Sequence, residues 1–340
     1  MNTAIKAFAA VEPGKPLEEF EFKPGPLGDE EVEIKVRYCG ICHSDLSMIR
    51  NEWGITQYPL VAGHEIIGEV VETGKNAKRL KPGDLVGVGW DAESCFSCKQ
   101  CLAGDQHLCP NAVGTIVGHR GGFAERVRCH WAWAFPLPAG IDPATAGPLF
   151  CGGITVFSPI LLHEIMPTAK VAVIGIGGLG HMALRFLNRW GCEVTAFTSS
   201  EGKREEALRL GAHHAVNSRD PSAIGKLAGA FDFILSTVNV PLDWPAVIAA
   251  LAPKGRLHFV GALLNPMPTP IMPLIMGQRE ISASPTGNID TIAKMLDFAA
   301  RHQIAPVVEQ FPMSRINDAF AHLSEGKARY RIVLENDLWK

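Results

Sequence analysis

Runs in which hydrophobic and polar residues alternate dominate the first half of this 340-residue chain. EVEIKVRYC (31–39), HEIIGEVVETG (64–74) and GDLVGVGW (83–90) follow a two-residue period, which is typical of strands with one buried face. Turn residues separate these runs: LKPGDLV (80–86) places Pro-Gly-Asp between two of them. Short strands spaced in this way predict a small, partly open β-barrel or a β-sandwich.

The pattern changes near residue 150, where strands begin to alternate with helices. KVAVIGIGGLGHMALRFLNRWG (170–191) predicts an apolar strand, a glycine-rich turn and a helix, and EGKREEALRLGA (201–212) predicts a second helix. Further strands are expected at 192–200, 213–218, 231–238 and 255–263. This alternation predicts a parallel, doubly wound sheet, so the fold class is α/β with a β-rich domain beside it.

The last part of the chain returns to a different pattern. DTIAKMLDFAARHQI (290–304) and INDAFAHLSEG (316–326) predict amphipathic helices, and RYRIVLEN (329–336) predicts a closing strand. No internal repeat is evident. A chain of this length predicts two domains, each large enough to bury its own core.

Composition and charge narrow the classes of partner. The chain is 47% hydrophobic and 20% charged, as in ordinary globular proteins, and its net charge of -3 argues against nucleic acid or an anionic membrane as the main partner. The N-terminus lacks the apolar core of a signal peptide, and glycines and prolines break the longest uncharged run, AGPLFCGGITVFSPILL (146–162). We therefore expect a cytoplasmic protein, whose nine cysteines are mostly thiols.

Four of these cysteines gather within CFSCKQCLAGDQHLC (95–109): Cys95, Cys98, Cys101 and Cys109. Thiolates this close can converge on one tetrahedral Zn²⁺, with Zn–S bonds of about 2.3 Å. Because sulfur fills all four positions, such a zinc would be structural. An iron–sulfur cluster, free thiols and a nucleic-acid-binding zinc ribbon are the alternatives, and the last lacks the basic and aromatic residues that it needs.

A second group of possible metal ligands is spread along the chain. Cys39 and Cys42, in CGICHSDL (39–46), have CxxC spacing, which fits a redox disulfide, half of a zinc site or coincidence. A catalytic zinc needs three protein ligands and one open position. Three residues from separate segments could supply them: Cys42, His64 and Cys151. Two carboxylates could orient these ligands: Asp45 and Glu65. Taken singly, His64 could equally be a core or surface histidine, and Cys151 a small buried hydrophobe.

A glycine-rich turn predicts a dinucleotide site. The G-x-G-x-x-G pattern comprises Gly175, Ile176, Gly177, Gly178, Leu179 and Gly180. It follows the apolar run VAVI and opens a helix, which is the context that this fingerprint requires. The glycines allow a tight turn and close approach of a pyrophosphate to the helix N-terminus. A glycine turn with a purely structural role is the alternative.

The residues after the next predicted strand indicate which dinucleotide is bound. An NAD enzyme would place Asp or Glu about 20 residues after the glycines, on the ribose hydroxyls. This chain has hydroxyls and cations instead: Thr198, Ser199, Ser200, Lys203 and Arg204. Such groups suit a 2′-phosphate, which a carboxylate would repel, and we therefore favour NADP(H). The alternative is that Ser200 caps the helix and the two cations face solvent. Glu201 lies beyond the expected strand end.

Taken together, these motifs resemble the zinc-dependent medium-chain alcohol dehydrogenases. The resemblance is strongest to the cinnamyl alcohol dehydrogenase-like branch and, within it, to bacterial broad-range NADPH-dependent aldehyde reductases. It rests on segments in family order along nearly the whole chain: CGICHSDL (39–46), PLVAGHEIIGEV (59–70), the four-cysteine segment, GPLFCGGITVF (147–157), VIGIGGLGHMA (173–183) and KARYRIV (327–333).

The resemblance implies a fold, a set of ligands and a proton path. A GroES-like catalytic domain would comprise residues 1–152 and 294–340, with a structural-zinc lobe at about 91–111, and a Rossmann domain residues 153–293. Cys42, His64 and Cys151 would bind the catalytic zinc, the second of two zinc ions per chain, and Cys39 would be a bystander. Ser44 would pass the proton, although it could also merely cap the helix that follows. Family members end this path on a histidine where this chain has Ser47.

Other implied roles concern the ligands and the assembly. Thr155 matches a family position near the nicotinamide, and Trp53 and Trp90 match segments that line the substrate cleft, although both could be core aromatics. The implied function is reversible reduction of aliphatic or aryl aldehydes to primary alcohols with NADPH. The alternatives are a polyol or amino-alcohol dehydrogenase, or a non-catalytic zinc protein. A homodimer is expected, for which LLNPMPTPIMPLIMG (263–277) is either an interface or a buried connection.

Overall fold

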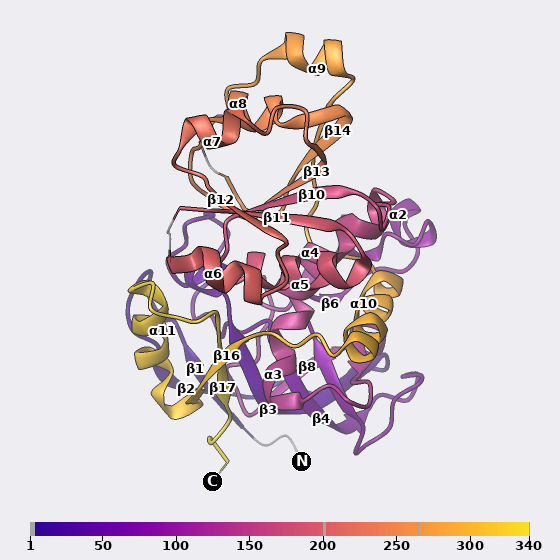
Figure 1. The fold of residues 1–340 in the computed structure, drawn as a ribbon. Helices are drawn as coiled ribbons and strands as arrows, with labels where there is room; N and C mark the ends of the chain where they lie inside the picture. Colours follow the sequence, from indigo (N-terminus) through magenta and orange to yellow (C-terminus); the bar gives the residue numbers. More distant parts are fainter. Residues whose placement is uncertain (1–3, 200–201, 264, 340) are drawn as a thin grey trace. The chain divides into compact units, whose positions relative to one another are not determined.

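The computed structural model describes residues 4–199, 202–263 and 265–339, and the chain forms two compact units. One unit contains Met1–Ile154 and Thr286–Lys340, and the other contains Thr155–Pro285. Figure 1 traces both along the sequence. Both ends of the chain thus contribute to the first unit.

The first unit is built on a seven-stranded sheet with the strand order β16-β17-β3-β4-β5-β9, in which β8 also pairs with β3. Its strands are β3 (Glu31–Ile41), β4 (Glu65–Thr73), β5 (Leu85–Val88), β8 (Arg126–His130), β9 (Ala134–Pro136), β16 (Val308–Pro312) and β17 (Arg331–Glu335). Two small pairs complete the strands described: β1 (Ile5–Ala9) with β2 (Glu18–Phe22), and β6 (Asp91–Glu93) with β7 (Val113–Gly114).

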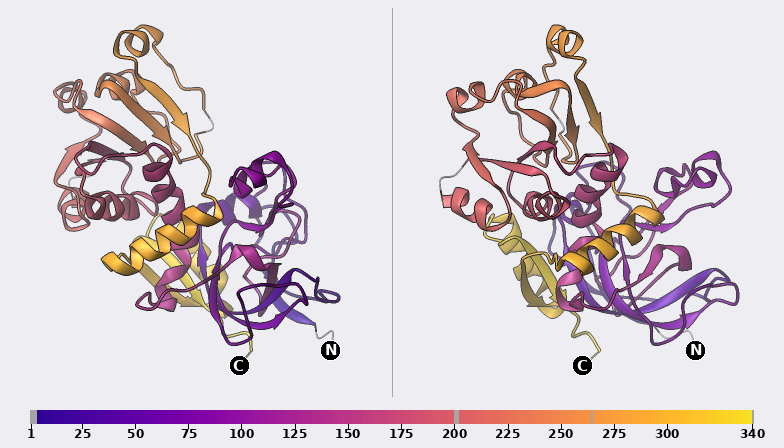
Figure 2. Two further views of the ribbon diagram at one scale, coloured as in Figure 1. Left: turned by 90° about the vertical axis from the view of Figure 1, so that its right-hand side faces the viewer. Right: turned by 45° about the vertical axis from the view of Figure 1, so that its right-hand side comes forward.

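Short helices connect these strands, and two longer helices belong to the C-terminal part. They are α1 (His43–Ile49), α2 (Lys99–Leu102), α3 (Pro143–Ala146), α10 (Ile289–His302) and α11 (Ile316–Ser324), with 3₁₀ turns η1 (Gln106–Leu108), η2 (Trp131–Trp133), η3 (Gly147–Phe150) and η4 (Met313–Arg315). Helix α11 packs beside β16 and β17 (Figure 2). Alternation along β3 and β4 turns Ile34, Val36 and Ile66 into a core that Phe123 and Phe320 also fill.

The position of β17 explains how the two chain ends meet. It lies antiparallel to β3, with Ile332 opposite Ile41 and Leu334 opposite Cys39. Strand β4 lies antiparallel on the other side of β3, with Gly40 opposite Glu65. The end of β3 therefore meets the beginnings of both β4 and β17.

The second unit is a six-stranded sheet in which every pair of neighbours is parallel, with the order β12-β11-β10-β13-β14-β15. The strands are β10 (Lys170–Ile174), β11 (Glu193–Thr198), β12 (His214–Asn217), β13 (Phe231–Ser236), β14 (Leu251–Phe259) and β15 (Glu280–Ala283). Counted from one along this unit, the six strands lie in the order 3-2-1-4-5-6, which is that of a dinucleotide-binding doubly wound sheet. The predicted fold class is therefore confirmed.

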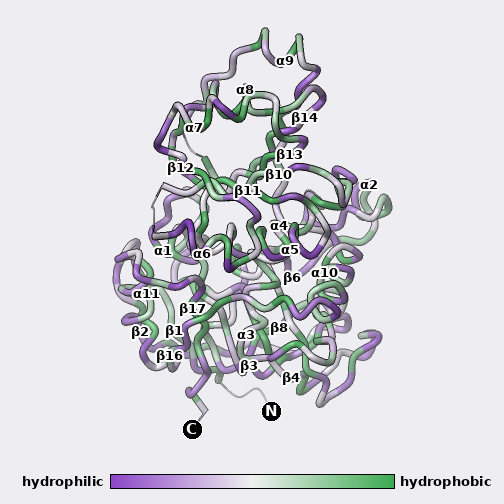
Figure 3. Tube along the Cα trace, viewed as in Figure 1, coloured by the Kyte–Doolittle hydropathy of each residue, from purple (hydrophilic) through white to green (hydrophobic). Residues whose placement is uncertain are grey.

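Helices follow the strands of this sheet as its topology requires. They are α4 (Gly152–Leu162), whose first residues belong to the other unit, α5 (Gly180–Trp190), α6 (Gly202–Arg209), α7 (Pro221–Gly225), α8 (Trp244–Ala249) and α9 (Ile271–Gly277). Strands β10 and β13 carry mostly hydrophobic residues (Figure 3), because helices cover a parallel sheet on both faces. Strand β14 begins at Leu251, four residues before the strand that the sequence predicts.

Helix α9 tests the interpretation of residues 263–277 as a buried connection. Four of its apolar side chains are more than half exposed: Ile271, Met272, Ile275 and Met276. The interpretation as a buried connection is therefore wrong for this helix in the single chain. No described helix has by itself the length and apolarity to span a membrane; Pro143–Phe150 and Gly152–Leu162 satisfy both criteria only as a pair, bent by 52°.

Candidate active site

A buried group of side chains that could hold a metal ion lies at the end of the first unit's sheet. The ligand atoms of Cys42, His64, Glu65 and Cys151 all lie within 4.8 Å of one another. His64 Nε2 is 3.2 Å from Cys151 Sγ, and the two sulfur atoms are 3.8 Å apart. The structure thus brings together the three ligands that the sequence predicts for the catalytic zinc, and adds Glu65 to the group.

Local structure explains why these distant residues meet. Cys42 follows β3 and is the N-cap of α1, whereas His64 immediately precedes β4, the neighbour of β3. Gly63 has φ +95°, a left-handed conformation that favours glycine and turns the chain into β4. Cys151 follows η3, which lies against β3 and β4 so closely that a Cβ on Gly147 would be 2.6 Å from the Glu65 carbonyl oxygen.

Asp45 orients two of the three ligands. Its side chain is fully buried and accepts hydrogen bonds from the backbone N–H groups of Cys42 and Gly63, each 2.9 Å long. Asp45 Oδ1 also lies 2.9 Å from His64 Nδ1. A histidine that donates from Nδ1 to a carboxylate presents Nε2 as the metal ligand. The predicted orienting role of Asp45 therefore has a geometric basis.

The same contacts test the alternative prediction for Ser44, that it merely caps helix α1. The structure gives Cys42 as the N-cap of α1, and Asp45 reaches back to the Cys42 N–H. Ser44 lies inside the helix, so the alternative that it caps this helix is wrong. Its Oγ is 3.7 Å from Cys42 Sγ, which places a hydroxyl beside a predicted zinc ligand.

An arginine that the sequence interpretation did not include completes the site. Arg331, the first residue of β17, donates from Nη2 to Glu65 Oε1, and its Nη1 is 3.9 Å from Cys42 Sγ. Both side chains are at least 95% buried. Glu65 Oε2 and Arg331 Nε have no hydrogen-bond partner within the described parts of the chain. An arginine directly before the apolar run IVL of this strand is the sequence signal for this contact.

The charges of this group favour a thiolate at Cys42. The hydrogen bond from Cys151 lowers the pKa of Cys42 well below its usual value, and the charges of Arg331 and His64 act in the same direction against burial. Next to this thiolate, the pKa of Cys151 is raised. Burial raises the pKa of Glu65 to about 7, although Arg331 opposes the shift. Two sulfurs and one oriented imidazole, beside the buried carboxylate of Glu65, form a donor set that fits a catalytic zinc.

Two tryptophans adjoin these ligands. The Trp90 ring lies edge-on to the His64 imidazole at 5.1 Å, and the Trp53 ring lies 6.1 Å from Trp90. Both are half-buried against the core of the first unit. They can therefore act both as core aromatics and as one wall next to the metal ligands.

A carboxylate, that of Glu52, lies beside Ser47, the residue that stands where family members end the proton path. Ser47 Oγ donates a 2.6 Å hydrogen bond to Glu52 Oε2, near the end of α1. His43 is exposed at the beginning of that helix. Glu52 was missed in the sequence, because no spacing rule links it to Ser47.

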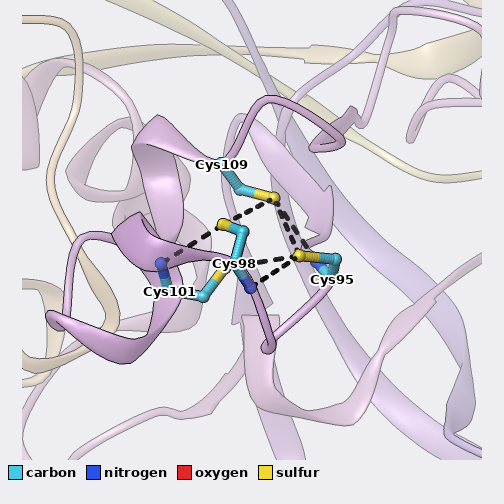
Figure 4. A group of neighbouring side chains, drawn as sticks. All are labelled: Cys95, Cys98, Cys101 and Cys109. Atoms are coloured by element: carbon cyan, nitrogen blue, oxygen red, sulfur yellow. Dashed lines mark hydrogen bonds between the residues drawn. The ribbon is translucent and has the colours of Figure 1, made fainter.

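The four cysteines of the lobe also meet around one point (Figure 4). Their sulfur atoms lie within 4.8 Å of one another, with 3.5 Å between Cys109 and Cys95 and 3.8 Å between Cys98 and Cys109. Backbone N–H groups point at the sulfurs: Cys98 N lies 3.3 Å from Cys95 Sγ and Cys101 N lies 3.5 Å from Cys98 Sγ. A hydrogen bond from the backbone of Ser97 is the main cause that lowers the pKa of Cys95 to about 6. This set of four thiols fits a closed tetrahedral zinc site.

The glycine turn joins β10 to α5 in the second unit. Gly175 has φ +89°, and a Cβ on Gly180 would overlap the Gly175 carbonyl, so both positions require glycine. A Cβ on Gly177 would meet open space, which is where a phosphate can approach the backbone. Thr237 Oγ1, a contact missed in the sequence, donates to carbonyls of this turn and fixes its shape.

The predicted 2′-phosphate residues follow β11. Thr198 is buried at the end of this strand, and Ser199 is exposed directly after it. Lys203 and Arg204 lie in the first turn of α6. Ser200 lies outside the described residues. Thr155 is buried in α4.

Comparison with known proteins agrees with this architecture. Residues 28–139 match the model of the alcohol dehydrogenase GroES-like domain, and residues 178–301 match that of the zinc-binding dehydrogenases. Aldehyde reductase AdhA from Synechocystis is 58% identical over 98% of this chain and 99% of its own length. Aldehyde reductase YahK from Escherichia coli is 38% identical over 98% of this chain and 97% of its own length.

A solved structure shows the same fold over the full length. A cinnamyl alcohol dehydrogenase from Sorghum bicolor has a TM-score of 0.93 and 35% identity, covering 98% of each chain. Identity at this level over nearly the whole chain, together with both family models, shows common descent. The chain therefore belongs to the zinc-dependent medium-chain alcohol dehydrogenase family, in its cinnamyl alcohol dehydrogenase-like branch.

Proposed function

We propose that this chain is an aldehyde reductase that uses NADPH and a zinc ion held by Cys42, His64 and Cys151 to reduce aldehydes reversibly to primary alcohols. The observation that carries the proposal is the buried set of two sulfurs and one imidazole oriented by Asp45. The names of the two aldehyde reductases that it resembles support this reaction. Zinc bound to this set would act as a Lewis acid on the substrate oxygen.

The chain's own residues would prepare this site in defined ways. Asp45 holds His64 with Nε2 directed at the sulfurs, and Arg331 balances negative charge at Cys42 and Glu65. The Ser44 hydroxyl, 3.7 Å from Cys42 Sγ, would transfer a proton to or from the substrate oxygen. Trp53 and Trp90 would exclude water and favour flat or aliphatic substrates over polyols, which need several polar partners.

We further propose that Cys95, Cys98, Cys101 and Cys109 hold a second, structural zinc. The lobe supports this role because its four thiols would leave no position for a substrate. Each chain would then bind two zinc ions, both within the unit that contains Met1–Ile154.

NADP(H) is the proposed cofactor of the second unit. Gly175, Gly177 and Gly180 shape the turn that would receive its pyrophosphate, and NADPH would supply the hydride. The hydroxyl of Ser199 and the cations of Lys203 and Arg204 would bind its 2′-phosphate. A cinnamyl alcohol dehydrogenase from Helicobacter pylori, complexed with NADP(H), is 31% identical with a TM-score of 0.89, which supports this choice.

Initial rates of cofactor oxidation test the proposal directly. We expect turnover of a medium-chain and an aromatic aldehyde with NADPH and much slower turnover with NADH. Comparable rates with NADH would overturn the cofactor assignment and leave the zinc chemistry. Zinc-loaded enzyme that oxidises polyols but reduces neither aldehyde would overturn the substrate class.

A further inference from the structure

A pocket of about 440 Å³ in the first unit is lined by residues outside both groups of metal ligands. Its lining includes Phe22 at the end of β2, Lys23 directly after it, Arg120 in the loop before β8, and Arg126 and Arg128 on β8. A cavity of this size accommodates a small organic molecule but not a polymer. No part of the proposed reaction uses it.

Two of its cations share one carboxylate. Arg126 and Arg128 form ion pairs with Glu33 at 3.0 and 2.9 Å, and Glu33 is almost completely buried. Arg128 Nη1 also donates to three backbone carbonyls in the 24–26 turn. These two arginines therefore form the rigid floor of the pocket.

Two other cations have surplus charge. Within the described parts of the chain, neither Lys23 nor Arg120 has a carboxylate within ion-pair distance. The Arg120 guanidinium lies 4.6 Å from the centre of the Phe22 ring and 5.4 Å from that of Phe20. Stacking fixes the plane of the guanidinium and leaves its N–H edges available for a bidentate anion.

One lining carboxylate opposes an anion. Glu31 Oε2 accepts a 2.7 Å hydrogen bond from the Gly28 N–H, which holds the carboxylate at the pocket wall. The lining still has a net positive charge, because Lys23 and Arg120 add two unpaired charges against one from Glu31. Pro24, Pro26 and Phe22 provide an apolar wall beside them.

We propose that this pocket binds a small organic anion with a doubly charged head group, a phosphate monoester or a dicarboxylate, whose apolar body lies against Phe22. Lys23 and the edge of Arg120 would hold the head group through charge-assisted hydrogen bonds. This site is distinct from the proposed cofactor phosphate site, because Lys203 and Arg204 belong to the other unit.

Isothermal titration calorimetry of the full, zinc-loaded chain in saturating NADPH tests this site, since bound cofactor then occupies its own phosphate subsite. The probes are inorganic phosphate, phenyl phosphate and phthalate. We expect phenyl phosphate or phthalate to bind with one equivalent per chain, more tightly than inorganic phosphate, and to weaken as salt increases. Preference for one of the two identifies the head group. No binding of either at millimolar concentration, or inorganic phosphate binding as tightly as both, would overturn the proposal.

Variants connect the binding to the named residues. Lys23→Ala and Arg120→Gln should each weaken binding by about tenfold or more, because each removes a charge-assisted contact. Glu31→Gln should strengthen it, since the amide oxygen can still accept from Gly28 while the opposing charge is lost. Lys15→Ala, an exposed lysine outside the lining, is the matched control and should leave the affinity unchanged. Binding that is unaffected by both Lys23→Ala and Glu31→Gln would refute the site.

Discussion

Asp45→Asn is the substitution with the most clearly defined consequence for the metal site. In the folded chain Asp45 Oδ1 accepts from Gly63 N–H and contacts His64 Nδ1, while Oδ2 accepts from Cys42 N–H. Asparagine can keep an oxygen in the place of Oδ1 only if its NH₂ group takes the place of Oδ2 and faces the Cys42 N–H. The Cys42 N–H then has no acceptor, and the two remaining hydrogen bonds lose the negative charge of the acceptor.

The expected loss of stability follows from these three contacts. An unsatisfied buried N–H costs about 1–3 kcal/mol, and each bond that changes from charged to neutral loses about 1 kcal/mol. Because Asp45 is fully buried, solvent screening does not reduce these values. We expect a free energy of unfolding lower by about 3–5 kcal/mol, and a catalytic zinc affinity lower by about 10–100-fold because His64 loses its orienting carboxylate.

Two measurements with one control check this expectation. Urea unfolding of the zinc-loaded protein gives the stability, and competition with a chelator gives the zinc affinity of the site formed by Cys42, His64 and Cys151. Asp29→Asn is the control, because Asp29 is exposed and its side chain forms a surface ion pair with Lys75. A loss of stability below about 1 kcal/mol together with unchanged zinc affinity would refute the assigned role of Asp45.

Three further predictions address the ligands, the cofactor and the assembly. Cys42→Ser should reduce the zinc content from two ions per chain to one and abolish activity, whereas Cys39→Ser should retain both; metal analysis that finds two ions in the first variant would contradict the ligand set. Replacing Lys203 and Arg204 with Ala should raise the KM for NADPH by about tenfold or more and leave that for NADH almost unchanged, because only the 2′-phosphate differs; equal effects in steady-state kinetics would argue against the phosphate site. Met276→Lys should convert the proposed homodimer to a monomer in size-exclusion chromatography with light scattering, since this side chain is 78% exposed in the single chain; a monomeric unmodified protein would rule out the interface.

Local patterns in the sequence predicted the parts of this protein that are themselves local. The four cysteines of the lobe lie within 14 positions, and the glycine turn directly joins one strand to one helix, so their spacing was informative. The ligands of the other site lie 87 and 109 positions apart, and only the family resemblance connected them. Hydrophobic periodicity cannot reveal contacts between residues so far apart in the sequence, because it relates only neighbouring residues within one helix or strand.

Other features required the three-dimensional structure. The ion pair of Arg331 with Glu65 joins residues 266 positions apart, and it depends on both β4 and β17 pairing with β3. The helix cap at Cys42 was missed, because a serine two positions later is the more usual capping residue. The exposure of α9 was also undetermined, since an apolar run suits a covered surface and a buried segment equally well.

The separation of the ligands along the chain also affects the order in which the two proposed metal sites would form. The lobe presents all four of its thiols within one short segment, so an unfolded or partly synthesised chain can already bind an ion there. The ligands of the other group come from the end of β3, the start of β4 and the residue after η3, up to 109 positions apart, and meet only once the first unit has folded. Metal at this second site would therefore bind the folded chain alone and stabilise it by mass action, whereas metal in the lobe would also bind the unfolded chain and stabilise the fold less for the same affinity.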